Sequence, residues 1–247
     1  MKKLYFLLIA LTITSFSFGQ TTVFQESFET GNSGTASVTC NDGFYDFFTR
    51  TNGSDLGNGN YIATGGDGTF YFAAQDIDAT ECGASATETL TFSGINITSY
   101  TNLTLALLAA EDDASDGNQD WDSTDNVLIE AQIDGGGYST VIAFESTGAS
   151  NSVPALDTNF DGEGDGTQLT SSFQEFTASL GTGGTLDLRI TFTLNSGDED
   201  IAIDNIRVID NYSASPTILV SAGISGLDYE FGSGPSTTGT FTLKAQI

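Results

Sequence analysis

Apolar and polar residues alternate along most of this chain, and the alternation predicts β-strands. From Leu186 to Leu194 every second residue is apolar, while the intervening residues are polar or charged. A period of two is typical of a strand with one buried face. The same pattern occurs over 103–107 and 127–133. Further strands are expected at 22–28, 44–50, 60–64, 69–75, 87–93, 172–180 and 201–209.

Turn signals separate these segments. The clearest is Asp134-Gly135-Gly136-Gly137, which divides 127–133 from an apolar return over 138–144 and predicts a hairpin. About eleven strands with little helical periodicity predict an all-β fold, a two-sheet jelly-roll (concanavalin-like) sandwich over 20–210. The aromatic run Phe44, Tyr45, Phe47 and Phe48 is expected within a core strand.

The N-terminus has the features of a secretory signal peptide. Lys2 and Lys3 precede an apolar run over 4–11, and Ser17 and Gly19 are small residues at the expected cleavage site. We therefore expect residues 1–19 to be removed and the mature chain to be secreted or displayed at the cell surface. No later apolar run is long enough for a transmembrane helix, so membrane insertion is not expected.

Cysteine content agrees with export. Cys40 and Cys82 are the two cysteines of the chain and are expected to form a disulfide, because oxidising compartments favour one. Two free buried thiols are the alternative. With no histidine and two cysteines, zinc and copper sites of the usual kinds are nearly excluded.

The chain is strongly acidic, with a formal net charge of −27. Loss of Lys2 and Lys3 would leave Arg50, Arg189, Arg207 and Lys244 against 33 acids. Nucleic acid and anionic membrane surfaces are therefore not expected partners. Most of the acids are expected on a solvated surface.

One segment predicts a calcium site. Oxygen-bearing side chains alternate with other residues in 157–167, and Gly162 follows them at a turn. Calcium is bound by such oxygen ligands and tolerates irregular geometry. The expected ligands of this structural ion are Asp157, Asn159, Asp161, Glu163 and Asp165. The segment departs from an EF-hand because Gln168 stands where that motif has a bidentate Glu.

A second acidic segment, 111–125, surrounds Trp121, the only tryptophan. An exposed Trp121 beside Asp120 and Asp122 would suit a sugar ring, because aromatic planes stack on sugar C–H faces and carboxylates accept from hydroxyls. A tryptophan that caps the core is the alternative. A second calcium site in this segment is a further possibility.

The last predicted strand contains a phase slip. Ile201 and Ile203 share one parity, whereas Ile206 and Val208 share the other, so a β-bulge is expected at Asp204-Asn205. Such a bulge can redirect a carboxylate.

Four segments together carry a family resemblance: residues 26–30 (ESFET), 71–78 (YFAAQDID), 186–190 (LDLRI) and 201–208 (IAIDNIRV). They resemble a family of exported Bacteroidetes proteins, the jelly-roll modules related to MAM and choice-of-anchor domains. The resemblance implies a structural cation between the first and last strands, with Glu29 and Asp204 as ligands. A polar residue at a strand end is the plain alternative. In that family a C-terminal sorting domain often directs type IX secretion, and no such domain is recognised here.

The C-terminal segment differs from the rest. A linker is expected at 211–216. Residues 227–229 (LDY) and 232–236 (GSGPS) resemble the start of an Ig-like repeat. The two or three strands expected in 217–247 cannot bury a core alone. We expect an incomplete second domain, and a tail that packs on the sandwich is the alternative.

These features favour a calcium-stabilised binding or adhesion module, the N-terminal part of a larger secreted or surface protein, with a glycan or a cell-surface protein as partner. A glycan-degrading enzyme is one alternative, because such enzymes need two carboxylates about 5–9.5 Å apart and this chain is rich in acids. No catalytic residues were identified. A structural spacer is the other alternative.

Overall fold

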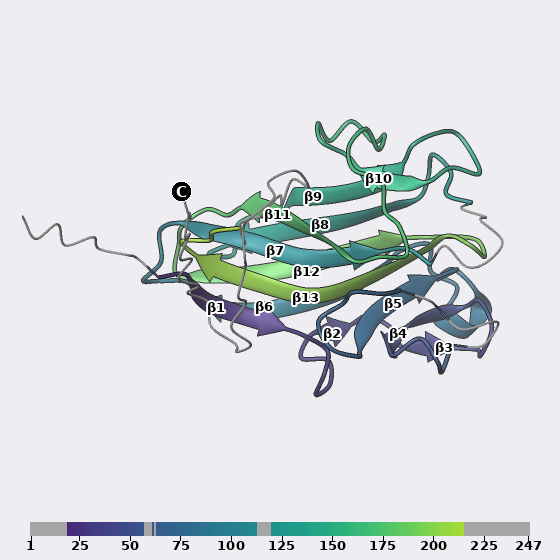
Figure 1. The fold of residues 1–247 in the computed structure, drawn as a ribbon, viewed down its shortest axis with the longest axis horizontal. Helices are drawn as coiled ribbons and strands as arrows, with labels where there is room; N and C mark the ends of the chain where they lie inside the picture. Colours follow the sequence, from purple (N-terminus) through teal and green to yellow (C-terminus); the bar gives the residue numbers. More distant parts are fainter. Residues whose placement is uncertain (1–18, 57–60, 62, 113–119, 215–247) are drawn as a thin grey trace, which may run out of the picture. The chain divides into compact units, whose positions relative to one another are not determined.

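The computed structural model describes residues 19–56, 61, 63–112 and 120–214. They form an all-β sandwich of two antiparallel sheets with jelly-roll connections (Figure 1). The strands are β1 Thr21–Glu26, β2 Thr35–Ala36, β3 Cys40–Asn41, β4 Phe47–Thr51, β5 Tyr71–Gln75, β6 Glu88–Asn96, β7 Leu103–Ala110, β8 Asn126–Ile133, β9 Ser139–Ser146, β10 Pro154–Leu156, β11 Gln174–Ser179, β12 Thr185–Thr193 and β13 Asp200–Asp210.

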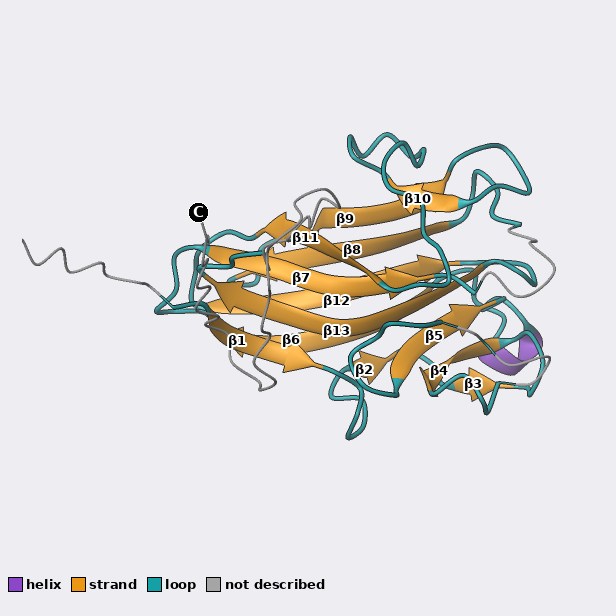
Figure 2. Ribbon diagram, in the orientation of Figure 1, coloured by secondary structure: helices purple, strands orange, loops and turns teal. Residues whose placement is uncertain are grey.

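The chain repeatedly crosses between the two sheets. One sheet has the order β11-β7-β13-β5-β4-β3, with β1 also paired to β13, and the other has the order β10-β9-β8-β12-β6-β2. A single 3-10 turn, Thr80–Cys82, is the only helical element of the described residues (Figure 2). It is too short to cross a membrane, and no described helix is long and apolar enough to do so.

Alternation builds the core as predicted. In β12, Leu186, Leu188, Ile190 and Phe192 are buried between the sheets, while the residues between them are partly exposed. Burial of a side chain of this size stabilises by about 1.5–3 kcal/mol. The predicted hairpin is confirmed, since β8 pairs with β9 across a turn in which Asp134 and Gly135 have positive φ.

Ten of the predicted strands are found with shifted ends, and the short strands β2, β3 and β10 were not predicted. For the strand expected at 60–64, the described residues 61, 63 and 64 contain only an isolated bridge of Thr64 to Ser172.

The aromatic run Phe44, Tyr45, Phe47 and Phe48 is only partly within a core strand. Phe47 and Phe48 are buried in β4, but Phe44 and Tyr45 are 61% and 41% exposed, because the strand begins after them.

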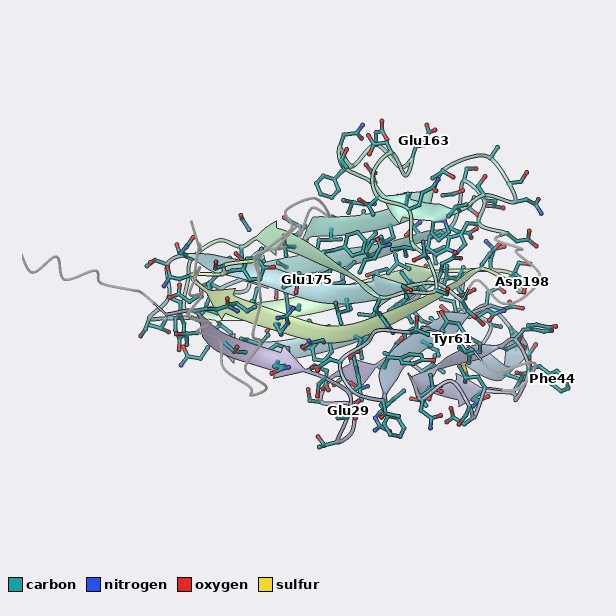
Figure 3. The ribbon with its side chains drawn as sticks, viewed as in Figure 1. Glu29, Phe44, Tyr61, Glu163, Glu175 and Asp198 are labelled. Atoms are coloured by element: carbon teal, nitrogen blue, oxygen red, sulfur yellow. A yellow bond between two sulfur atoms is a disulfide. The ribbon has the colours of Figure 1, made fainter. Side chains whose placement is uncertain are left out.

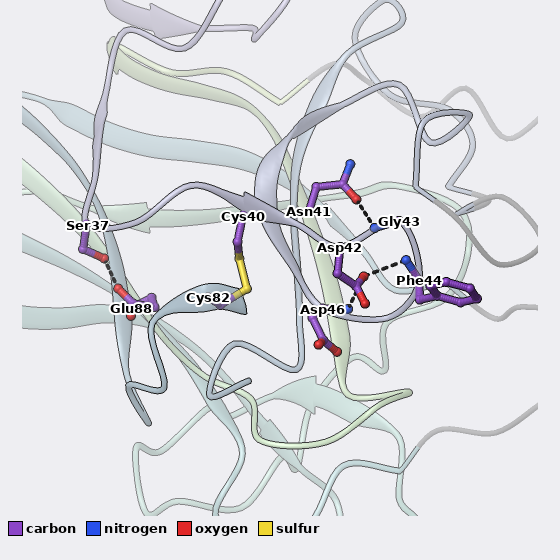
Figure 4. Close-up of a disulfide and its surroundings, with 9 residues drawn as sticks. All are labelled: Ser37, Cys40, Asn41, Asp42, Gly43, Phe44, Asp46, Cys82 and Glu88. Carbon is purple, nitrogen blue, oxygen red and sulfur yellow. Dashed lines mark hydrogen bonds between the residues drawn. A yellow bond between two sulfur atoms is a disulfide. The ribbon is translucent and has the colours of Figure 1, made fainter. Parts of the chain in front are cut away.

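The expected disulfide is confirmed. Cys40 and Cys82 are bonded, with their Cα atoms 5.1 Å apart (Figure 4). The bond joins β3 to the 3-10 turn, and it encloses a segment of 42 residues. Closing a loop of this length stabilises by about 4 kcal/mol in the chain-entropy model.

The predicted bulge is also found. Pairing of β13 with β7 shifts between Asp204 and Arg207, and Asn205 has a φ of 45°. On its other side, β13 pairs with β5 before the bulge and with β1 after it. The bulge therefore marks the place where β13 exchanges one partner strand for another.

The predicted signal peptide, apart from Gly19, lies outside the described residues, and so does the tail 217–247. The expected linker is described only as far as residue 214.

Candidate metal centre

Three carboxyl groups from two loops converge near the sandwich end that carries Asp198 (Figure 3). Asp122 and Asp125 precede β8, and Glu199 precedes β13. One carboxylate oxygen from each residue lies within 4.8 Å of the other two. Asp125 and Glu199 are buried, and Asp122 is partly exposed. In the described part of the chain, this is the only group of three or more acids with such spacing.

Neighbouring polar groups position these side chains. Asp125 accepts hydrogen bonds from the backbone N–H of Asp122 and from Nδ2 of Asn195, the latter at 3.1 Å. The backbone N–H of Asn195 donates to Glu199 Oε2 at 2.6 Å. Asp122 Oδ1 accepts from the backbone N–H and the hydroxyl of Thr124, both at 2.7 Å. Asn195 therefore contacts both buried carboxyl groups.

Burial controls the charge of the cluster. It raises the pKa of Asp125 to about 6, although the hydrogen bond from Asp122 opposes the shift. Burial and then the charge of Asp125 raise the pKa of Glu199 to about 8. Burial and then the charge of Asp157 raise the pKa of nearby Glu145 to about 7. Carboxyl groups this close cannot all carry a negative charge unless a cation compensates it. Without a cation, at least one of them stays protonated.

The arginines of the described chain lie elsewhere. Arg189 forms a bidentate pair with Glu130 at 2.8 and 2.9 Å, and Arg207 pairs with Glu175. Arg50 donates to the backbone carbonyls of residues 28 and 29. A cation for the carboxyl cluster would therefore come from solution, and the oxygen-only side-chain donors fit a hard divalent ion.

The predicted calcium loop folds as a series of local turns. Asp157 is buried and accepts from the backbone N–H groups of Asn159, Phe160 and Gly162 at 3.0, 2.6 and 3.0 Å. Asp165 accepts from the N–H and the hydroxyl of Thr158. These bonds occupy carboxylate oxygens that an ion would use, and calcium binding by this loop stays a prediction.

The other three predicted ligands in this loop, Asn159, Asp161 and Glu163, are exposed. Asn159 Oδ1 accepts from the backbone N–H of Asp161 at 2.9 Å. Asp161 Oδ1 accepts from the backbone N–H of Glu163 at 3.2 Å. Figure 3 shows Glu163 on a loop beyond β10.

Glu29 and Asp204 bind the same short segment. Glu29 Oε1 accepts from the backbone N–H groups of Thr69 and Phe70, at 2.7 and 2.6 Å. Asp204 Oδ2 accepts from the N–H of Asp67 at 2.6 Å. Hydrogen bonds from Phe70 and Thr69 lower the pKa of Glu29, whereas burial raises that of Asp204 to about 7. Residues 67–70 thus link the carboxyl groups that the resemblance pairs, and a cation there stays a prediction.

The structure contradicts the hypothesis that Trp121 contacts a sugar, and it confirms the alternative of a tryptophan in the core. Its side chain has no exposed surface and belongs to the core, and its backbone pairs with Ser152. It cannot stack on a sugar in this conformation. Asp120 instead accepts from Nδ2 of Asn151 at 2.5 Å, and Asp122 belongs to the carboxyl cluster.

Sequence reasoning did not identify Glu199 as a ligand. It lies 74 residues after Asp125, so no local spacing relates the two. Its position just before the strand predicted at 201–209 is the only sequence signal, and many acids of this chain stand next to a predicted strand.

Comparisons with known proteins give similar folds only. No protein-family model matches the sequence, and no curated protein sequence matches it. The CBM22-1 xylan-binding domain of Paenibacillus barcinonensis Xyn10C is 11% identical, covering 79% of this chain and 97% of that one, with a TM-score of 0.41. The third cleaved adhesin domain of the Lys-gingipain of Porphyromonas gingivalis is 13% identical, covering 77% and 99%, with a TM-score of 0.43.

A structure of TmCBM61 in complex with β-1,4-galactotriose is 8% identical, covering 74% of this chain and 92% of that one, with a TM-score of 0.39. Likenesses this weak carry no argument about ligands or sites.

Proposed function

We propose that this domain is a calcium-stabilised binding or adhesion module that acts outside the cell. The observation that carries the proposal is the convergence of Asp122, Asp125 and Glu199 without a basic partner among the described residues. An ion there would join the segment before β8 to the segment before β13 and fix one end of the sandwich. Binding residues often lie on loops that a rigid scaffold holds in position.

Calcium fits this cluster better than other common ions. It accepts six to eight oxygen ligands in irregular arrangements, whereas magnesium requires a nearly ideal octahedron. Zinc prefers histidine and cysteine, but the chain has no histidine and both cysteines are in the disulfide. Exported proteins also meet calcium at concentrations that a weak site can use.

Burial argues against a hydrolytic role for these carboxyl groups. A glycosidase needs one protonated and one ionised carboxyl group that both reach the scissile bond. Asp125 and Glu199 have 0% and 3% exposed surface, so a sugar cannot reach them without opening the site.

The expectations of export, of a MAM-like family and of a larger parent protein rest on the sequence alone and remain parts of the proposal.

Thermal unfolding of the mature chain tests the calcium site. An ion that binds the folded state alone stabilises it by about 2.7 kcal/mol at a hundredfold excess over Kd. We expect calcium to raise Tm in the wild type, and Asp125→Asn with Glu199→Gln to remove that rise. Glu88→Gln is the matched control, because Glu88 is a buried carboxyl group that accepts from Ser37 outside the cluster. A calcium response that survives in the double variant would contradict the assignment.

Binding assays separate the three functional classes. A module should bind a glycan or a cell surface without releasing reducing sugar. Release of reducing sugar would favour the enzyme, and absence of binding to a broad glycan array and to cells would favour the spacer.

A further inference from the structure

Two aromatic side chains are exposed in the turn between β3 and β4. Phe44 is 61% exposed and Tyr45 is 41% exposed. Folding normally removes such surface from water. We propose that Phe44 and Tyr45, here called the aromatic tip, form a docking surface for an arginine-bearing segment of another protein. The inference rests on the proposed binding function and names the chemistry of its partner.

The turn that carries the aromatic tip is held in a defined shape. Asp42 Oδ1 accepts from the backbone N–H groups of Phe44 and Asp46, at 2.6 and 3.2 Å (Figure 4). The backbone N–H of Asp42 donates to the carbonyl of Asp46 at 3.1 Å. The Cys40–Cys82 disulfide fixes the strand from which the turn begins. A pre-organised surface loses little conformational entropy when it binds, which favours affinity.

Figure 4 shows the ring of Phe44 turned away from the disulfide. Tyr45 lies against the loop between β12 and β13, because a Cβ on Gly197 would be 3.9 Å from its Cβ and Cγ atoms. In Figure 3, Phe44 is at the same end of the sandwich as Asp198 of that loop. The aromatic tip is thus presented beside the loop that supplies Glu199.

Carboxylates surround the base of this turn. Burial, and then the charge of Asp42, raise the pKa of Asp46, and the charges of Glu81 and Asp78 act in the same direction. The five acids that act on one another here are Asp42, Asp46, Asp76, Asp78 and Glu81. The arginines of the described chain are engaged elsewhere, and no salt bridge of the described residues involves this turn. A positive partner would relieve this repulsion.

Arginine matches both parts of the surface. Its planar guanidinium stacks on aromatic faces and pairs with carboxylates through two parallel hydrogen bonds. A neutral sugar could stack on the rings and donate hydrogen bonds to the carboxylates, but it would leave their negative charge uncompensated. A second copy of the chain would bring further negative charge, given its net charge of −27. Charge complementarity therefore favours a cationic segment over either alternative.

Fluorescence anisotropy with labelled peptides tests the proposal on the mature chain. The probe is a short peptide that alternates arginine with glycine, and the comparison peptides carry lysine or citrulline, the neutral analogue, in place of arginine. We expect the arginine peptide to bind most tightly and added salt to weaken it. Phe44→Ser is expected to weaken binding by about two- to fivefold, the fold-change of an exposed cation–π contact.

Phe160→Ser is the matched control, since Phe160 is 54% exposed in a different acidic loop. Equal binding of the citrulline or lysine peptide, an unchanged affinity in Phe44→Ser, or an equal loss in Phe160→Ser would each overturn the proposal. Failure here is distinguishable from failure of the proposed function, because calcium-dependent Tm values are measured without any peptide.

Discussion

At the scale of single residues, the most informative feature is the set of buried acids. A carboxylate removed from water is unfavourable unless it gains a proton, a cation or several hydrogen bonds. Asp157 and Glu29 gain hydrogen bonds from backbone N–H groups. Asp125 and Glu199 gain fewer, and they lie close together. The charge of these two residues therefore depends on pH and on any ion that binds them, as does the charge of Glu145, whose pKa burial also raises.

This sensitivity predicts that, in a calcium chelator, the domain becomes less stable as pH rises from about 5 to 8. Burial raises the pKa of Glu145 to about 7 and, with Asp125, that of Glu199 to about 8, whereas both ionise near 4.5 in an unfolded chain. In that window the folded state holds protons that the unfolded state has released, so stability falls with rising pH.

The slope is at most about 1.4 kcal/mol per pH unit for each group. Thermal unfolding in EDTA at several pH values measures it. Glu145→Gln with Glu199→Gln should reduce the slope without removing it, because Asp76 and Asp204, whose pKa burial also raises to about 7, still titrate in this window. A wild-type Tm that rises towards pH 8 would contradict the assignment.

Trp121 gives a second prediction at this scale. Trp121→Ala should cost about 3–5 kcal/mol of unfolding free energy, as truncation of a buried aromatic residue does. Trp121→Phe should cost less, because Nε1 of Trp121 has no hydrogen-bond partner among the described residues. Chemical denaturation measures both. A loss below 1 kcal/mol in Trp121→Ala would show that the side chain is exposed in solution, as the sugar hypothesis requires.

At the scale of elements, the bulge in β13, a central strand of its sheet, lies close to the segment 66–70. The bulge turns Asp204 towards this segment, where Gly66 and Gly68 allow close approach. A Cβ on Gly68 would lie 2.5 Å from the carboxyl carbon of Glu29. A Cβ on Gly66 would lie 2.7 Å from Oδ2 of Asp204. Gly66 and Gly68 are therefore required because a Cβ would collide with these carboxyl groups, and Gly68 is required also because its φ is positive.

Alanine substitutions separate these two requirements. Gly65 and Gly68 have φ values of +80° and +94°, so both variants should lose about 1–2 kcal/mol from the positive φ. Gly65 has open space around its Cβ position, whereas Gly68 does not. We predict that Gly68→Ala is the more destabilising in chemical denaturation. Equal losses would show that Glu29 moves aside at little cost.

Long elements were predictable from the sequence, and short ones were not. The nine residues of β12 contain four full alternations, which specify both the strand and its buried face. Strands β2 and β3 have two residues each, too few to show a period, and they form because neighbouring strands offer backbone partners. The bulge was predictable, since a phase slip within one strand is a local signal.

The candidate site was less predictable than the fold. Asp122 and Asp125 stand in an acidic segment that the sequence marks, but Glu199 reaches them only through the order of strands in the two sheets. Burial of Trp121 and exposure of Phe44 likewise depend on where strands begin and end, which alternation alone does not specify.

At the scale of the whole molecule, charge dominates. A net charge of −27 disfavours anionic partners. Repulsion between the negative side chains also destabilises the folded state, so a bound cation should stabilise it. Calcium, rather than ionic strength alone, is expected to do this through Asp122, Asp125 and Glu199.

Isothermal titration calorimetry of calcium into the mature, EDTA-treated chain tests this most directly. We predict binding with a Kd on the order of 10⁻⁴–10⁻³ M, as in other extracellular modules. The heat should depend on the buffer, because calcium displaces a proton from the buried pair. Asp125→Asn with Glu199→Gln should abolish binding at this cluster, and Asp157→Asn should leave binding at the cluster unchanged. No binding at millimolar calcium, or binding that is lost in Asp157→Asn and kept in the double variant, would contradict the assignment.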